Sequence, residues 1–225
     1  MLRLDPPAHP ELWDQHVDTG FAKRSVIADL GDPVERVALE ELLADADAVV
    51  IGYRPGALAR FGWDPSGLRA RHPRLVTVAL DAWGDSGPWG ERRGFDSIVQ
   101  AAVGIAQLYG IETEDGWRPG ALPVQALDHA TGMGVASAVV ALLAARAEGR
   151  LGSAHLSLAG TAAHLLAAPP PPADAAVTAL DVPLHTTPSP YGELTYVPPS
   201  LTIDGVALDY RAGPQRYGGA ELTWC

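Results

Sequence analysis

The sequence contains few cationic residues, almost no lysine and a single cysteine. Lys23 is the only lysine, and 16 Lys and Arg residues stand against 27 Asp and Glu residues, for a formal net charge of −11. Because a nucleic-acid partner requires a basic face, this balance argues against one. The single cysteine, Cys225, excludes an intrachain disulfide and a cysteine-based metal cluster, and it suits the reducing cytoplasm.

Long apolar runs are also scarce. The N-terminus, MLRLDPP, has no apolar core of signal-peptide length. The most apolar stretch, residues 130–145, is shorter than the roughly 20 residues that cross a bilayer, and it contains Gly and Ser. We therefore expect a buried helix there, no membrane partner and a cytoplasmic location.

What is present is a globular composition, with 47% apolar and 19% charged residues. Short apolar runs alternate with segments of helical spacing, which predicts an α/β fold: a Rossmann-like, open, mostly parallel sheet with flanking helices. The segment from residue 6 to Gly20 is expected to be irregular. A crossover helix from Pro33 is expected to join a parallel pair of strands. The predicted strands are residues 2–5, 24–30, 48–52, 75–80 and 152–158.

The composition changes at Pro169, where a run of four prolines begins. Proline favours the stiff polyproline II conformation, so we expect a linker. The predicted organisation is an α/β domain over residues 1–168, a Pro-rich linker over 169–190, and an irregular tail over 191–225 with short β pieces.

Asp128 lies where an apolar run, predicted to be a strand, meets a helical pattern rich in Gly and Ala. Aspartate is a favoured N-cap because its carboxylate accepts the free N–H groups of the first helical turn. A plain capping role is therefore the simplest interpretation of Asp128. A carboxylate at a helix start is also favoured in its ionised form.

Other catalytic patterns have little support. Ser86 lies in Gly-Asp-Ser-Gly-Pro but lacks the Gly-x-Ser-x-Gly elbow of the α/β-hydrolases. The histidines are scattered without metal-ligand spacing, so no metal site is expected.

Several segments together resemble the class III CoA-transferases, the CaiB/BaiF type that includes formyl-CoA and carnitine CoA-transferases. Each motif alone is weak, and their joint order over residues 2–167 is specific. The matching segments are Lys23 to Pro33, Tyr53-Arg-Pro-Gly56, Pro73-Arg-Leu75, Gly84-Asp-Ser-Gly-Pro88, Arg93-Gly-Phe-Asp96, Asp128 before its small-residue helix, and Gly149-Arg-Leu-Gly with Ser157-Leu158.

The resemblance implies covalent catalysis by Asp128. In this family an aspartate at that position attacks the thioester of an acyl-CoA, and CoA passes through an aspartyl thioester to an acceptor carboxylic acid. No permanently bound cofactor is expected, because coenzyme A and acyl-CoA are substrates.

The resemblance also assigns the CoA-binding residues. Tyr53 and Arg54 match the turn that contacts CoA, and Gly52 stands where the family more often has Asn. Arg60 follows on the adjacent helix, and Arg93 matches a position near the phosphates. The complete set of expected CoA-contacting residues is Gly52, Tyr53, Arg54, Arg60, Arg93 and Phe95.

Two alternatives to a CoA-transferase remain. The related acyl-CoA racemases carry a histidine at the position of Phe95, and phenylalanine cannot move a proton, so the racemase hypothesis is the weaker one. The chain resembles a shortened member of the family, so it could also be a non-catalytic CoA-binding or assembly module. Either a homodimer or a partner chain that supplies missing elements is expected from the resemblance.

Overall fold

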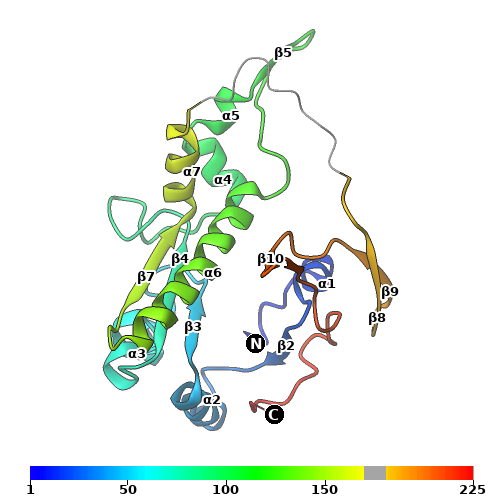
Figure 1. The fold of residues 1–225 in the computed structure, drawn as a ribbon. Coiled ribbons are helices and arrows are strands. Elements are labelled where there is room, and N and C mark those ends of the chain that lie inside the picture. The colour runs from blue at the N-terminus through cyan, green and yellow to red at the C-terminus, as the bar shows by residue number, and fades with distance from the viewer. Residues whose placement is uncertain (170–180, 225) are drawn as a thin grey trace. The chain divides into compact units, whose positions relative to one another are not determined.

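The computed structural model describes residues 1–169 and 181–224. Within them the chain forms two units (Figure 1): residues 1–42 together with the C-terminal segment 181–224, and residues 43–169. Every residue predicted for the CoA site lies in the second unit. Of the Pro-rich linker predicted over residues 169–190, residues 170–180 lie outside the described residues, and His185–Ser189 form strand β8.

The second unit is built on a three-stranded parallel sheet of order β3-β4-β7. Short, mostly apolar segments form the strands, as predicted. In the register of the sheet, Ile51 pairs with Ala79, and Asp81 pairs with Ser157. The carboxyl ends of all three strands therefore lie at one edge of the sheet. The strands are β3 (Ala48–Ile51), β4 (Val76–Asp81) and β7 (Ser153–Ser157).

Helix α6 (Ala126–Ala147) lies along one face of this sheet (Figure 1). Val135 of the helix packs with Val76 and Val78 of β4 in a common core. The helix approaches β7 so closely that a Cβ on Gly134 would lie 2.8 Å from the Leu156 side chain. The small residues of α6 thus permit its contact with the sheet.

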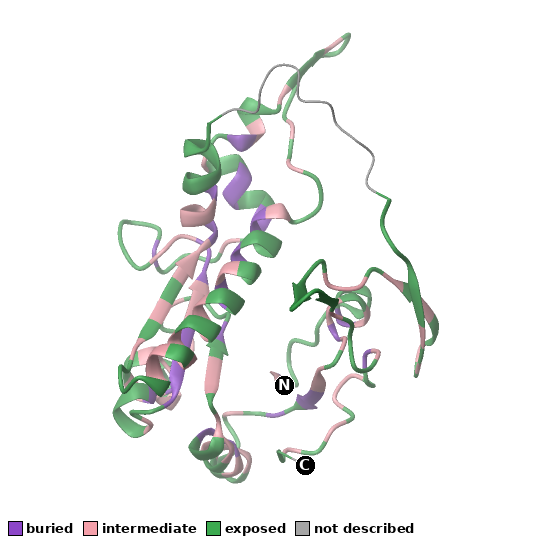
Figure 2. Cartoon of the chain, viewed as in Figure 1, coloured by how far each residue is buried: buried purple, intermediate pink, exposed green. Residues whose placement is uncertain are grey.

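The expectation of a short, buried helix was wrong for α6. It has 22 residues, of which only Leu127, Thr131 and Val135 are buried. These three residues recur every four positions and form one stripe, while Figure 2 shows most of the remaining surface exposed. Among the described helices, α6 alone is long and apolar enough to cross a membrane by length and composition.

A second core lies around the start of α6. Leu127 packs there with Ala82, Val99 and Leu158. Asp64 caps α3 by accepting from the Gly67 N–H, with proline at the first helical position. The segment 96–108 is two helices interrupted around Gly104, whose φ is +90°. The helices are η1 (Ala59–Phe61), α3 (Pro65–Arg71), α4 (Asp96–Ala102), α5 (Ile105–Leu108) and α7 (Leu158–Ala167).

The first unit contains a parallel pair of strands, two antiparallel pairs and two helices. Strands β1 and β2 are parallel, with Leu4 opposite Val26. The C-terminal segment supplies the antiparallel pairs β8-β9 and β10-β11. The elements are β1 (Leu2–Asp5), α1 (Trp13–Thr19), β2 (Arg24–Ile27), α2 (Pro33–Asp45, which continues into the second unit), β8 (His185–Ser189), β9 (Gly192–Tyr196), β10 (Thr202–Ile203) and β11 (Val206–Ala207).

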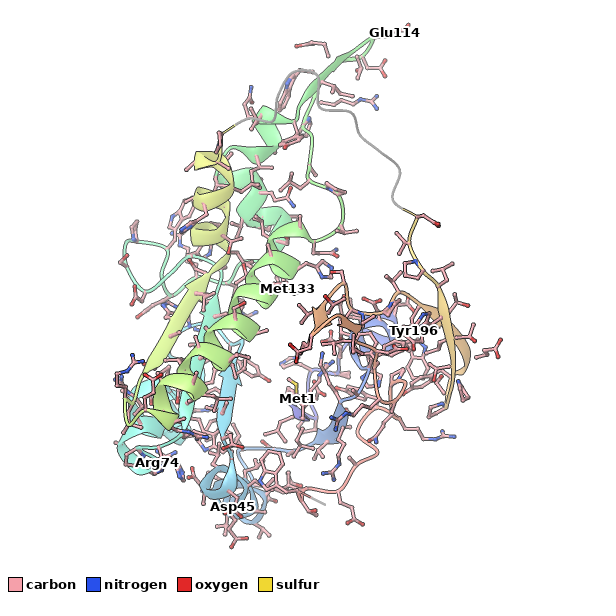
Figure 3. All side chains as sticks on the ribbon, in the orientation of Figure 1. Met1, Asp45, Arg74, Glu114, Met133 and Tyr196 are labelled. Atoms are coloured by element: carbon pink, nitrogen blue, oxygen red, sulfur yellow. The ribbon has the colours of Figure 1, made fainter. Side chains whose placement is uncertain are left out.

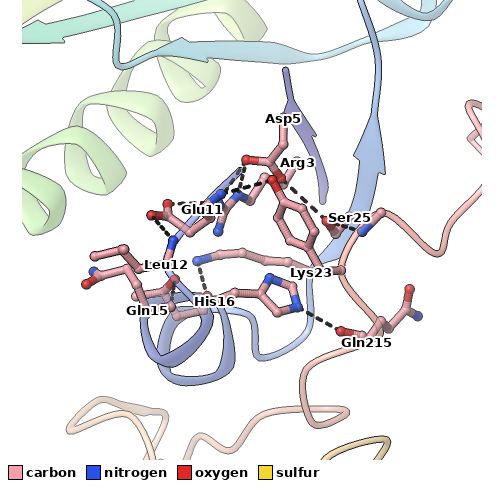
Figure 4. A network of polar contacts seen from close by, with 12 residues as sticks. Arg3, Asp5, Glu11, Leu12, Gln15, His16, Lys23, Ser25 and Gln215 are labelled. Carbon is pink, nitrogen blue, oxygen red and sulfur yellow. Dashed lines mark hydrogen bonds and ion pairs between the residues drawn. The ribbon is translucent and has the colours of Figure 1, made fainter. Parts of the chain in front are cut away.

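Polar contacts join the two ends of the chain in this unit (Figure 4). The buried Asp5 accepts from the Arg3 guanidinium at 2.8 Å. Ser25, 1% exposed, accepts from the Gly218 N–H at 3.0 Å. The His16 Nε2–H donates to the carbonyl oxygen of Gln215 at 2.9 Å. The C-terminal segment is therefore an integral part of the first unit.

Two local predictions were wrong. The segment expected to be irregular contains α1. Strand β2 pairs with β1, and β3 pairs with β4, so the expected pairing of β2 with β3 does not occur in the sheets of the described chain. The acidic segment after residue 111 forms a hairpin with Glu114 at its tip (Figure 3), built from β5 (Ile111–Thr113) and β6 (Gly116–Arg118).

Candidate active site at the carboxyl edge of the sheet

Gly52, Phe95 and the first turn of α6, which carries Asp128, lie at the edge where the parallel strands end. Gly52 directly follows β3, and Phe95 ends the loop that follows β4. The first turn of α6 reaches the same edge, because Leu127 packs against Ala82, the residue after β4, and against Leu158, the residue after β7. In α/β sheets this edge is where ligands bind.

Asp128 is exposed, and it lies in the first turn of α6. It does not cap the helix, and no strand precedes it, so both of those expectations were wrong. The cap comes instead from Asp96 on α4, whose Oδ2 accepts from the N–H of Leu127 at 2.8 Å and from the N–H of Asp128 at 3.1 Å. The Asp128 carboxylate is thus relieved of the capping role.

The pKa of Asp128 lies above the ordinary value for aspartate. Partial desolvation of the carboxyl group is the largest cause, although the residue as a whole is exposed. The negative charge of Asp96 raises the pKa further, and His129 acts in the opposite direction. The Asp128 carboxyl group therefore holds its proton more tightly in the folded protein than in the unfolded chain.

This shift predicts that Asp128→Asn stabilises the protein. A raised pKa contributes stability that is present below about pH 3.8, the ordinary value, and is lost as the pH rises through the folded-state pKa. The amide mimics the neutral carboxyl, so Tm at pH 7 should rise by about 1–2 °C, a small effect because solvent screens the group. Thermal denaturation of the variant and the parent at pH 7 and at pH 3 measures the difference in Tm. An increase in Tm that is larger at pH 3 than at pH 7 contradicts a raised pKa of Asp128.

The turn after β3 offers an open surface. A Cβ built on Gly52 meets no atom within 4 Å. Tyr53 is 45% exposed, and Arg54 is exposed. On the following 3₁₀ helix, the Arg60 guanidinium lies 4.5 Å from the centre of the Phe61 ring, which directs a planar cation along an aromatic face. This segment combines a tyrosine, two arginines and a glycine whose backbone a ligand can approach closely.

The loop after β4 holds the remaining predicted residues. Arg93 is exposed, and its carbonyl oxygen accepts from Trp83 Nε1 at 3.2 Å. Gly94 permits this closure, because a Cβ there would lie 2.4 Å from the Ala82 side chain. Phe95 is 73% exposed and immediately precedes Asp96. Phe95 is thus the chain neighbour of Asp96, the residue that caps α6.

The sequence did not single out Asp96, Gln100, Asp81 or His155 as site residues. Asp96 and Gln100 are both buried, and His155 Nε2 lies 2.6 Å from the Asp81 carboxylate. Asp81 also accepts from the N–H of Gly84, which fixes the start of the loop after β4. Asp81 and His155 come from separate strands, and the partners of Asp96 and Gln100 in the segment from Leu122 to Asp128 lie 22 to 32 residues away, so no spacing in the sequence indicates these contacts.

The fold defines an α/β protein with an exposed carboxylate in the first turn of a helix that meets the carboxyl edge of a parallel sheet. The sequence matches the family description CoA-transferase family III over residues 18–183, and the chain belongs to this family.

Known relatives agree with this assignment. The chain is 35% identical to the probable fatty acyl-CoA transferase Rv3272 of Mycobacterium tuberculosis over 61% of this chain and 34% of that protein. It is 34% identical to the succinyl-CoA–L-malate CoA-transferase beta subunit of Chloroflexus aurantiacus over 49% of this chain and 27% of that protein. A crystal structure of Rv3272 from Mycobacterium tuberculosis superimposes with a TM-score of 0.66 and 31% identity, over 74% of this chain and 47% of that one. The chain spans about a third of the length of these curated relatives.

Proposed function

We propose that the chain acts in CoA transfer between an acyl-CoA thioester and a carboxylic acid, with Asp128 as the nucleophile. The observation that carries the proposal is the exposed Asp128 carboxylate in the first turn of α6, at the carboxyl edge of the sheet. A buried or capping carboxylate could not reach a substrate. Family membership supports the class of reaction.

The chemistry follows from carboxylate exchange. An Asp128 oxygen attacks the thioester carbonyl carbon, the carbon–sulfur bond breaks, and the CoA thiolate leaves behind a mixed anhydride. The thiolate then attacks the aspartyl carbonyl, which releases the donor acid and forms an aspartyl–CoA thioester. An acceptor carboxylate repeats these two steps in reverse, so CoA ends on the new acid and Asp128 is regenerated. No redox partner or metal is required.

Chemical trapping tests the proposal. The 225-residue chain is incubated with acetyl-CoA and then treated with hydroxylamine, which converts an activated aspartyl group to a hydroxamate. Peptide mass spectrometry should find the added mass at Asp128, in a CoA-dependent manner. A parallel reaction on Asp115→Asn, an exposed carboxylate in the β5-β6 turn, should label equally. An unmodified Asp128 at saturating acetyl-CoA contradicts the covalent mechanism.

Arginine substitutions test the proposed CoA surface formed by Gly52, Tyr53, Arg54 and Arg60, with Arg93 and Phe95 on the loop after β4. A charge-assisted hydrogen bond to phosphate contributes about 1.5–3 kcal/mol, so Arg54→Ala and Arg60→Ala should each raise the Kd of CoA about tenfold or more. Isothermal titration calorimetry measures the change. Arg118→Ala removes an equally exposed arginine that pairs with Asp115 on the hairpin, and it should leave the Kd unchanged. Equal affinities in all three variants would refute this surface.

We further propose that the three-stranded sheet belongs to a larger Rossmann-like open sheet in the active assembly, either a homodimer or a complex with a partner chain, in the cytoplasm. The Chloroflexus aurantiacus relative, named as a beta subunit, supports the idea of a partner chain. Sedimentation of the chain with and without CoA tests for the homodimer.

A second candidate is a CoA-binding module without turnover. The match covers about a third of those relatives' length, so their whole activity does not carry over to this chain by similarity alone. It predicts CoA binding with the arginine dependence described above but no trapped intermediate on Asp128. The trapping and calorimetry experiments together therefore separate the two candidates.

A further inference from the structure

Asp96 is a buried carboxylate that caps a helix other than its own. It is the first residue of α4, is 3% exposed, and holds the N–H groups of Leu127 and Asp128 through Oδ2. The residue at the N-cap position of α6, Gln125, provides no side-chain cap. The orientation of the first turn of α6 therefore depends on α4.

Gln100 completes this connection. It lies one turn after Asp96 on α4, is 3% exposed, and donates from Nε2 to Asp96 Oδ1. Its Oε1 accepts from the N–H of Leu122 at 2.8 Å. Both oxygens of Asp96 and both ends of the Gln100 amide are thus used. The pair anchors the chain at Leu122 and again at Leu127 and Asp128.

The segment between these two anchors is strained. Val124 has a φ of +51°, in the left-handed region that β-branched residues rarely adopt. Such a conformation costs about 1–3 kcal/mol and persists only where its surroundings impose it. Val124 is 73% exposed, so packing of its own side chain does not hold it. The hydrogen bonds of Leu122 to Gln100 and of Leu127 and Asp128 to Asp96 hold the turn from either side.

We propose that Asp96 and Gln100 are positioning residues that hold the Asp128 carboxylate in its exposed orientation at the start of α6. This inference rests on the proposed role of Asp128 as nucleophile. Asp96 cannot take that role itself, because it is buried and both of its oxygens accept hydrogen bonds.

The charge of Asp96 adds a second effect on the same group. A buried anion next to Asp128 disfavours ionisation and so raises its pKa, which makes the ionised carboxylate more basic. His129, its neighbour on α6, acts oppositely. On α7, which also packs against α6, Thr161 hydrogen-bonds to Thr131, and His164 hydrogen-bonds to the carbonyl of Gly160 on its own helix. Removal of the Asp96 charge should therefore lower the pKa of Asp128.

Three variants separate position from charge. Asp96→Asn keeps an acceptor for the N–H groups of Leu127 and Asp128 and removes the charge. Gln100→Met keeps the charge of Asp96 and removes the hydrogen bond to the N–H of Leu122. Asp96→Ala removes both the charge and the acceptor for the two N–H groups. With acetyl-CoA and hydroxylamine, the labelling rate at Asp128 should fall about tenfold or more in Asp96→Ala and several-fold in Gln100→Met. In Asp96→Asn the acid midpoint of the labelling rate should move to lower pH, whereas it should not move in Gln100→Met. Asp115→Asn serves as the matched control.

A direct titration keeps this test independent of activity. Carbon-13 NMR of labelled aspartate carboxyls follows Asp128, which is assigned by its absence in Asp128→Asn. The titration midpoint should be lower in Asp96→Asn than in the parent, with circular dichroism showing that both are folded. An unmoved midpoint together with an unchanged labelling rate overturns the inference. If the parent is not labelled at all, the proposed function fails. The titration midpoint of Asp128 in Asp96→Asn and its carboxyl chemical shift in Gln100→Met then still decide whether Asp96 and Gln100 set the pKa and the position of the Asp128 carboxyl group.

Discussion

Asp128→Asn is expected to abolish CoA transfer, with a loss of rate on the order of a thousandfold or more. An amide cannot form the anhydride, so the covalent route closes completely rather than slowing in proportion to one lost contact. The substitution preserves the size of the side chain, and the cap on α6 comes from Asp96, so the helix should keep its start. The loss should therefore appear in kcat, with little change in the affinity for CoA.

The measurement is CoA exchange between a radiolabelled acid and its acyl-CoA, made at a saturating CoA-ester concentration. The matched control is Asp115→Asn, the same chemical change at an exposed carboxylate in the β5-β6 turn, which should retain the parental rate. A variant at Asp128 that exchanges CoA as fast as the parent would show that the carboxylate is not the nucleophile.

Leu127→Ala should be the most destabilising of the proposed substitutions. Leu127 is 1% exposed and packs with Val99, Ile105 and Leu158 at the start of α6. Removal of its buried side-chain atoms leaves a cavity between two helices and the sheet edge, which costs about 2–5 kcal/mol. Urea denaturation followed by circular dichroism measures this change in the free energy of unfolding.

The control for this cavity is Leu108→Ala in α5, where the leucine is 67% exposed. It should change the free energy of unfolding by less than about 0.5 kcal/mol. Because the N–H of Leu127 also donates to Asp96, Leu127→Ala should slow the labelling of Asp128 in the protein that remains folded. Similar unfolding free energies for the two leucine variants would contradict the assignment of this core.

The alternation of strands and helices was predictable because it depends on local spacing. The segments that form β1, β3, β4 and β7 were predicted within one or two residues of their ends. Apolar runs of four to six residues, bounded by Pro, Gly or Asp, suffice for such predictions. The short helix α1 lacks both a regular apolar face and a side-chain cap, which explains why it was missed.

Pairing and burial required the tertiary structure. Which strand lies next to β2 depends on surfaces remote in the sequence, and the structure gives β1 as its partner. Helix α6 is apolar on more than one side, so composition suggested burial, yet only one stripe contacts the sheet and its neighbours. Composition records what a helix could bury, not which of its faces meets a partner.

By itself, the sequence determined the α/β class, the resemblance to the CoA-transferase family and Asp128 as the residue of interest. Only the tertiary structure decided that Asp128 is free of the capping role, since the cap comes from Asp96, 32 residues earlier in the chain. A hydrogen bond between two helices depends on how they pack, and packing is set by the whole core rather than by the residues on either side of the bond.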